Sequence, residues 1–166
     1  DKKREEAIAA FKKAIAIDKG FKEAWLALGA AHHDNGAHEE AVSVLTKYLE
    51  LADDKAEELA YATLGDSCFQ TGEFEKAAVY LKRAAFLADD KKELAGLYYK
   101  IGNSFFELAE YDEGLSWYVS ALSVGPDYAN VLKELAAGFE RRGRKEAASR
   151  ILTMEALKTP SRSAAK

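Results

Sequence analysis

The feature that most constrains this chain is that it repeats itself. Five segments line up along its length: REEAIAAFKKAIAI, HEEAVSVLTKYLEL, FEKAAVYLKRAAFL, YDEGLSWYVSALSV and KEAASRILTMEALK. Each has a small residue at a fixed place, namely Ala7, Ala41, Ala77, Gly114 and Ala148, with spacings of 34, 36, 37 and 34 residues. A second kind of segment precedes four of them: AWLALGAAHHDNG, AYATLGDSCFQTG, LYYKIGNSFFELA and VLKELAAGFERRG. Self-similarity at such a period is typical of repeat architectures.

Both kinds of segment have helical periodicity. Apolar or small residues fall at i, i+3, i+4, i+7 and i+8 in the segment that holds Tyr61, Leu64, Gly65, Cys68 and Phe69. The segment that begins at Phe74 has the same period. The residues between the two segments are Gly36, Gly72, Ala109 and Gly143. Because glycine readily adopts the left-handed conformation that ends many helices, the unit is predicted to be an antiparallel helix pair.

The repeated positions resemble those of the tetratricopeptide repeat (TPR) family. In the best copy they are Trp25, Leu28, Gly29, Gly36, Ala41, Leu45 and Leu51. The second copy has Tyr61, Leu64, Gly65, Gly72, Phe74, Ala77, Leu81, Ala84 and Leu87. The third has Tyr98, Ile101, Gly102, Phe105, Tyr111, Tyr118, Ala121 and Pro126, and the fourth has Leu132, Leu135, Ala136, Phe139, Gly143, Ala148, Leu152 and Pro160. The resemblance implies an all-α fold, a right-handed superhelical α-solenoid of antiparallel helix pairs.

The resemblance covers essentially the whole chain. It divides the sequence into the second helix of a truncated repeat (1–21), four repeats (22–57, 58–94, 95–128 and 129–160) and a tail (161–166) that we expect to be disordered. Asp53 and Asp89 stand where the family usually ends a repeat with proline, and the longer repeats imply longer connectors or an extra helical turn. The aspartate pairs there are candidate helix N-caps.

Stacking of helix pairs requires both small and large residues. Gly29, Gly65, Gly102 and Ala136 are expected to allow close helix approach, and Trp25, Tyr61, Tyr98 and Leu132 to fill the space between layers. Gly114, where alanine is usual, weakens its helix by up to about 1 kcal/mol or permits a closer approach.

The histidines of AWLALGAAHHDNG raise the question of a metal site. His32 aligns with Cys68, Phe105 and Phe139, which predicts a packing position. His33 aligns with Phe69 and is expected to face the concave groove. Adjacent residues point about 100° apart on a helix, so His32 and His33 do not chelate one ion. His38 with Asp34 remains open as a surface metal site, but packing and groove roles are favoured and no metal or other cofactor is predicted.

The family's concave positions define a candidate partner-binding groove. They are Leu26, Ala30, His33, Asp66, Phe69, Gln70, Tyr99, Asn103, Phe106, Lys133 and Arg141, with Glu23, Asp34, Leu59 and Ala62 beside them. Aromatic residues flanked by small ones suggest an apolar-anchored peptide or helix as the ligand. The alternative is that Phe69 and Phe106 only complete packing. Of a basic cluster that would bind a chaperone C-terminal carboxylate, Asn103 alone is present.

Charge is uneven along the chain. Residues 22–128 carry 9 Lys and Arg against 20 Asp and Glu, whereas the sequence ERRGRKE forms a basic cluster near the end. This cluster could attract an acidic partner, or it could be a solvated basic turn. The formal net charge of −4 and the lack of basic residues interleaved with aromatic ones disfavour nucleic acid.

No catalytic constellation is present in the sequence. Cys68, the single cysteine, aligns with packing positions, so it is expected to be buried and unreactive. No apolar run approaches the roughly 20 residues of a membrane span. The chain opens on DKKREE without an initiator Met or signal pattern, which suggests an excised fragment or processed chain. We expect a soluble protein and favour a cytoplasmic location.

Three functions stay open at this point. The leading one is a non-catalytic scaffold or adaptor that binds a peptide or helix of a partner protein in the groove. The second is a self-assembling structural unit, because the helix with Ile8, Phe11 and Ile15 lacks a first-helix partner and no clear capping helix follows Leu157. The third is the regulatory adaptor part of a larger enzyme complex.

Overall fold

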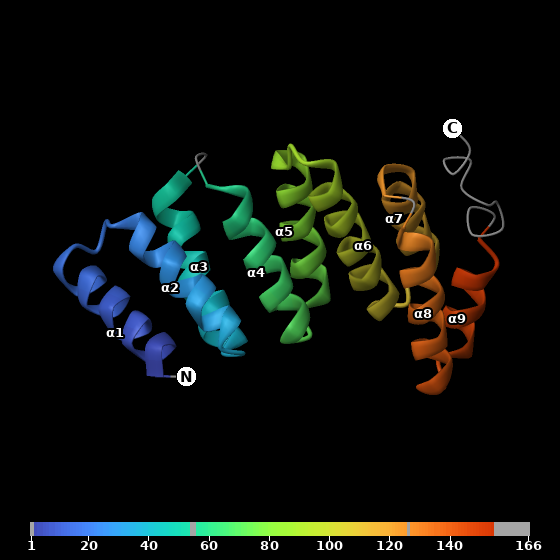
Figure 1. Cartoon of the computed structure of the whole chain (residues 1–166), viewed down its shortest axis with the longest axis horizontal. Coiled ribbons are helices and arrows are strands. Elements are labelled where there is room, and N and C mark those ends of the chain that lie inside the picture. The colour runs from blue at the N-terminus through green and yellow to red at the C-terminus, as the bar shows by residue number, and fades with distance from the viewer. Residues whose placement is uncertain (1, 54–55, 126, 155–166) are drawn as a thin grey trace. The chain divides into compact units, whose positions relative to one another are not determined.

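The periodic segments fold as α-helices. The computed structural model describes residues 2–53, 56–125 and 127–154, and it has no strand over these residues (Figure 1). The helices are α1 (Lys2–Ile17), α2 (Lys22–Asp34), α3 (His38–Ala52), α4 (Glu58–Gln70), α5 (Phe74–Leu87), α6 (Lys91–Glu107), α7 (Tyr111–Val124), α8 (Tyr128–Arg141) and α9 (Lys145–Leu152). The predicted all-α fold of helical repeats is confirmed. Pro126, Leu157, Pro160 and the predicted tail lie outside the described residues.

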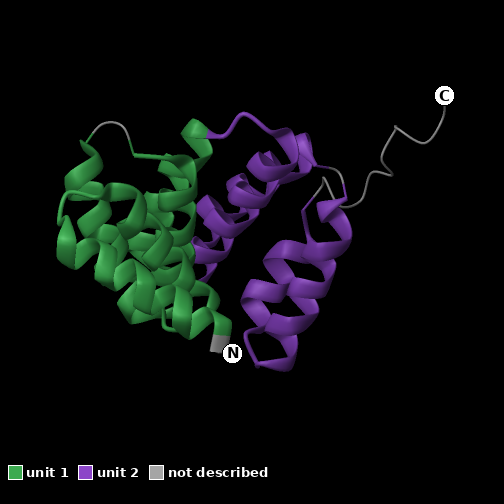
Figure 2. Cartoon of the chain, turned by 60° about the vertical axis from the view of Figure 1, so that its left-hand side comes forward, with its two compact units in different colours: residues 1–87 green, residues 88–166 purple. Residues whose placement is uncertain are grey.

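The helices group into two compact units, residues 1–87 and 88–166 (Figure 2). Unit 1 holds α1 and the pairs α2/α3 and α4/α5, and unit 2 holds the pairs α6/α7 and α8/α9. Each pair joins one segment of each repeated kind, as the sequence predicts. Helix α6 begins at Lys91, so the end of the range assigned to the second repeat belongs to the first helix of the next pair.

The core of unit 1 forms where small residues let paired helices cross closely. A Cβ atom built on Gly29 would lie 2.5 Å from Cγ of Leu45, and one built on Gly65 would lie 2.7 Å from Cγ of Leu81. Both leucines are fully buried. The prediction that Gly29 and Gly65 permit close approach is therefore confirmed. Trp25 and Tyr61 pack against this core as partly buried residues.

Unit 2 repeats this arrangement with larger side chains. A Cβ atom on Gly102 would meet the ring of Tyr118, and one on Gly114 would meet the ring of Phe106. The closer approach that Gly114 was expected to permit is present. Leu132 and Ala136 are fully buried, as predicted, and Phe139 packs with them in the same core.

The four helix pairs turn in the same way. Gly36, Gly72 and Gly143 have φ values of 76°, 81° and 76°, and Ala109 has a φ of 62° in the equivalent place. In each turn two successive backbone N–H groups donate to carbonyls of the first helix, which satisfies groups that the helix end leaves open. The predicted left-handed turn is confirmed in all four pairs.

The extra residues of the longer repeats lie in the connectors between pairs and in an additional helical turn. Asp90 caps α6, because its Oδ1 accepts hydrogen bonds from the backbone N–H groups of Lys92 and Glu93, both at 2.9 Å. Helix α6 has 17 residues against 13 in α4, which is an extra turn. The cap expected from the first aspartate pair is absent over the described residues. Helix α4 begins only at Glu58, and Asp53 instead ends α3 with a φ of 55°.

Candidate partner-binding faces

In unit 1 the first helices of the two pairs share a face. The Nδ1 atom of His33 on α2 lies 3.0 Å from Oγ of Ser67 on α4. The Ser67 hydroxyl donates to the carbonyl of Thr63 at 2.8 Å, so the His33 ring is the donor toward Ser67. We call the exposed and half-buried residues of α2 and α4 on this side the α2/α4 face: Glu23, Ala30, His33, Asp34, Leu59, Ala62, Asp66, Phe69 and Gln70.

Most of the candidate groove residues of unit 1 lie on this face. Gln70 is exposed, and Ala30, His33, Asp66 and Phe69 are partly exposed. Leu26 is the exception. It is 9% exposed and belongs to the core of unit 1, so the expectation that it lines an open groove is wrong. The physical reason is that Leu26 belongs to one hydrophobic cluster with buried residues of α4, among them Ala60 and Leu64.

An aromatic contact recurs across three of the four turns. The rings of His33 and His38, of Phe69 and Phe74, and of Phe106 and Tyr111 all have centroids 5.2 Å apart. These residues therefore pack within their own helix pair. Phe69 keeps part of its side chain exposed, whereas Phe106 is fully buried.

Phe106 is a core residue of unit 2. Its ring contacts the rings of Tyr118 and Phe139 at centroid distances of 5.0 and 5.7 Å. The expectation that Phe106 lines the groove is wrong, and the packing alternative holds for it. The physical reason is Gly114, which has no side chain to exclude the Phe106 ring from the space between α6 and α7.

Tyrosines of α6, α7 and α8 cluster in unit 2. The Tyr99 ring lies 5.9 Å from that of Tyr118 and 5.5 Å from that of Tyr128 at the start of α8. The Tyr118 hydroxyl donates to Oδ1 of Asn103 at 2.8 Å, so the Asn103 side chain is engaged inside the unit. Burial raises the pKa of Tyr99. Sequence reasoning missed Tyr128, although it lies one helical turn before Leu132 on α8.

One arginine of the basic cluster near the end of the chain, Arg144, makes structural contacts. Arg144 donates to Oε2 of Glu107 and to the backbone carbonyl of Phe106 at the end of α6. Its guanidinium lies 4.7 Å from the centroid of the Phe139 ring, and that of Arg142 lies 4.8 Å from it. The description of this cluster as a solvated basic turn is therefore wrong for Arg144. Lys133 and Arg141 are exposed on α8.

The titratable residues that suggested chemistry are packing residues. His32 is buried, and desolvation, with a smaller contribution from the nearby Lys12 charge, lowers its pKa below the ordinary value. Cys68 is fully buried, and burial raises the pKa of its thiol to about 11. Over the described residues no three His, Cys, Asp or Glu side chains come together in a group that could hold a metal ion. None of the described helices is long and apolar enough to span a bilayer.

Comparison with known proteins identifies the family. Models of the tetratricopeptide repeat match residues 1–62 and 59–89. A crystal structure of MamA is 28% identical, with a TM-score of 0.74 over 94% of this chain and 82% of that one. YrrB, described as a TPR protein with an unusual peptide-binding site, is 20% identical, with a TM-score of 0.72 over 91% of this chain and 75% of that one.

A third structure shows the same fold at lower identity. It is PilF of Pseudomonas aeruginosa, which is 17% identical with a TM-score of 0.64, over 90% of this chain and 66% of that one. No curated protein matches the sequence. The matches to repeat models, the left-handed turns within the helix pairs and the close Gly–Leu crossings all indicate the same repeat architecture. The chain belongs to the tetratricopeptide repeat family.

Proposed function

We propose that the chain is a non-catalytic scaffold that binds a peptide or a helix of a partner protein on the first helices of its repeats. Each unit offers its own face for this purpose, α2 and α4 in unit 1 and α6 and α8 in unit 2. TPR proteins are protein-interaction scaffolds, which supports the general function. The remaining candidate residues on these faces are Ala30, His33, Asp66, Phe69, Gln70, Tyr99, Asn103, Lys133 and Arg141.

The observation that carries this proposal is an exposed apolar side chain on the α2/α4 face. Leu59 is 56% exposed in the first turn of α4. Ala62, Asp66 and Phe69 follow it on the same side of the helix, where Ala62 and Phe69 are partly exposed. A large apolar residue beside small ones offers a partner side chain both an apolar contact and room to enter.

The tyrosines of unit 2 give that face a similar character. Tyr99 and Tyr128 are partly exposed and in ring contact with each other. Tyrosine rings bind partner side chains with large area at a small loss of conformational entropy, which is why they are frequent in interfaces. Helix α8 adds the exposed cations Lys133 and Arg141 and the exposed carboxylate of Glu140 to this face.

A self-assembling unit is the second candidate, and one observation favours it. Helix α1 packs on α2 in unit 1, but Ile8, Phe11 and Ile15 remain partly exposed and Ile17 is 89% exposed at its end. A second copy could cover this stripe. Light scattering across a range of protein concentrations tests this function, because a constant monomer mass removes it.

Peptide selection with matched variants tests the scaffold function. Random peptides of about 12 residues are selected on the full chain by phage display, and their Kd values are measured by fluorescence anisotropy. Leu59→Asp is expected to weaken selected peptides by about tenfold or more, because it places a charge against the apolar contact. The control is Phe86→Asp on α5, which alters an exposed apolar residue away from the first helices. An absence of enriched peptides, or peptides that bind Leu59→Asp undiminished, would refute the α2/α4 face as the site.

A further inference from the structure

The two first helices of unit 1 carry a one-sided charge. Over α2 and α4 the acidic residues are Glu23, Asp34, Glu58 and Asp66, and Lys22 is the single lysine or arginine. In unit 2, by contrast, α8 carries Lys133 and Arg141 against Glu134 and Glu140. The negative charge is therefore a property of the unit 1 helices and not of the repeat as such.

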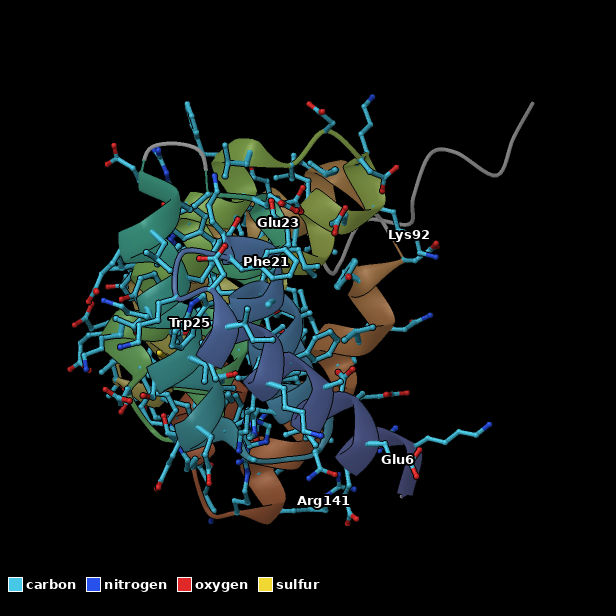
Figure 3. All side chains as sticks on the ribbon, turned by 90° about the vertical axis from the view of Figure 1, so that its left-hand side faces the viewer. Glu6, Phe21, Glu23, Trp25, Lys92 and Arg141 are labelled. Atoms are coloured by element: carbon cyan, nitrogen blue, oxygen red, sulfur yellow. The ribbon has the colours of Figure 1, made fainter. Side chains whose placement is uncertain are left out.

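The α2/α4 face carries three carboxylates along two helical rows, Glu23 and Asp34 on α2 and Asp66 on α4. Glu23, Ala30 and Asp34 are spaced i, i+7 and i+11 along α2, so Ala30 and Asp34 each lie within about 20° of Glu23 around the helix. Leu59, Asp66 and Gln70 have the same spacing along α4. In the α2 row two carboxylates lie on either side of Ala30, and in the α4 row one carboxylate, Asp66, lies between Leu59 and Gln70. Glu23 lies on the opposite side of α2 from Trp25 (Figure 3).

Two of these carboxylates are open to a partner. Glu23 and Asp34 are exposed, and neither has an ion-pair partner in the part of the chain that the structure describes. Asp66 is partly exposed and already interacts within the chain. It adds to the negative electrostatic potential of the face, but the inference does not require it to contact the partner. Carboxylates near an apolar surface attract cations and select against anionic ligands.

We infer that the α2/α4 face binds a basic amphipathic segment of another protein. Apolar side chains of the segment lie against Leu59 and Phe69, and its lysine or arginine residues lie against Glu23 and Asp34. Charge complementarity and the exposed Leu59 together carry this assignment, which rests on the proposed scaffold function and adds the chemistry of its ligand. Acidic segments are excluded by like-charge repulsion with the same carboxylates.

A pair of synthetic peptides tests this inference on the full chain. One is an amphipathic helix of about 14 residues with leucine at i, i+3, i+4 and i+7 and lysine elsewhere, and the other has glutamate in place of every lysine. The basic peptide is expected to bind at least about tenfold more tightly than the acidic one. Its affinity is expected to fall as NaCl rises from about 0.05 M to 0.5 M, because exposed charge pairs are screened.

Charge reversal locates the binding. The double variant Glu23→Lys with Asp34→Lys is expected to lose about tenfold or more in affinity for the basic peptide, because attraction becomes repulsion. The matched control is Glu39→Lys with Glu75→Lys, which reverses two exposed carboxylates on the second helices α3 and α5 and changes net charge equally. Equal losses in both double variants would show general attraction to an acidic protein and would overturn the inference.

The remaining outcomes separate the inference from the scaffold function. If the acidic peptide binds as tightly as the basic one and Leu59→Asp abolishes both, the face is a binding site but the ligand is not basic. If neither peptide binds and random peptides are not enriched, the proposed function itself fails. The protein's mass in solution could also rise with concentration and stop doing so in the Glu23→Lys, Asp34→Lys variant. That result would show that the face binds a second copy of the chain, and it would overturn the inference of a different partner.

Discussion

A Cβ atom built on Gly102 would lie 2.3 Å from Cε1 of Tyr118. A side chain at position 102 would therefore overlap the ring of Tyr118. At the same crossing, a Cβ atom on Gly114 would lie 2.4 Å from Cδ2 of Phe106. Each glycine thus receives a ring from the opposite helix. The pair α6/α7 uses glycine against an aromatic ring where the pairs of unit 1 use glycine against leucine.

Substitution of Gly102 tests this crossing directly. Gly102→Ala is expected to lower the free energy of unfolding by about 1–3 kcal/mol, because the new methyl overpacks against the Tyr118 ring. Denaturant unfolding followed by circular dichroism measures the change. Gly138→Ala on α8 is the control, since a Cβ there has nothing within 4 Å. That variant is expected to gain up to about 1 kcal/mol from helix propensity. A neutral Gly102→Ala would contradict the geometry of the crossing.

The turn of the third pair is predicted to be strained. Ala109 has a φ of 62°, a left-handed conformation that costs a residue with a Cβ atom roughly 1–2 kcal/mol. The equivalent residues of the other pairs are glycines. Ala109→Gly is expected to raise the free energy of unfolding by about 0.5–1 kcal/mol, after the larger entropy of glycine in the unfolded chain is subtracted.

The reverse change provides the comparison for Ala109. Gly36→Ala places the same strain in the first turn, where φ is 76°, and is expected to destabilise by about 1 kcal/mol. Thermal unfolding of both variants beside the wild type measures the two effects. The opposite order of midpoints, with Gly36→Ala above Ala109→Gly, would show that the turns do not hold the conformation described.

Features that are local in sequence were predictable. The helix pairs follow from apolar spacing, and the turn at Ala109 follows from its alignment with three glycines. The crossing of Gly65 over Leu81 was also predictable, because the same small and large positions recur in every copy. Each repeat shows the same pattern of small and large residues, so the pattern could be recognised from several copies. A single copy would not have been sufficient.

Features that depend on a particular partner side chain were not predictable. Phe106 aligns with Phe69, but it is buried because Gly114 leaves space for its ring and Phe139 covers it. In the sequence Arg144 is one of several neighbouring basic residues. In the structure it binds Glu107 at the end of α6, 37 residues earlier in the chain. In both cases the outcome is set by contacts between helices that the repeat pattern does not specify.

Because of its contacts, Arg144 is expected to contribute more to stability than Arg142 does. Arg144 and Glu107 are 28% and 20% exposed and form a charged hydrogen bond, and Arg144 also donates to the carbonyl of Phe106. Arg144→Ala is expected to cost about 2–3 kcal/mol of stability, since bonds to charged groups contribute roughly 1.5–3 kcal/mol. Arg142→Ala, which removes an exposed side chain above the same ring, is expected to cost under about 1 kcal/mol.

A double-mutant cycle assigns the effect of Arg144 to its partner. Arg144→Ala and Glu107→Gln are measured singly and together by denaturant unfolding. A coupling energy of about 1 kcal/mol or more is expected, because the pair is only partly exposed to solvent. Additive effects would mean that Arg144 stabilises unit 2 through Phe139 and the Phe106 carbonyl alone.

Burial of His32 predicts a pH dependence of stability. Desolvation lowers its pKa in the folded chain below the ordinary value of 6.5, so between the two pKa values the unfolded chain binds more protons. Stability from this residue is therefore fully present above pH 6.5 and is lost as pH falls from 6.5 toward the folded-state pKa. His32→Phe removes the titrating group and keeps an apolar ring, as the fourth pair does with Phe139. Urea unfolding at pH 7.5 and at pH 5 is expected to show a smaller loss of stability in the variant than in the wild type. Equal losses in the two proteins would show that protonation of His32 does not oppose folding.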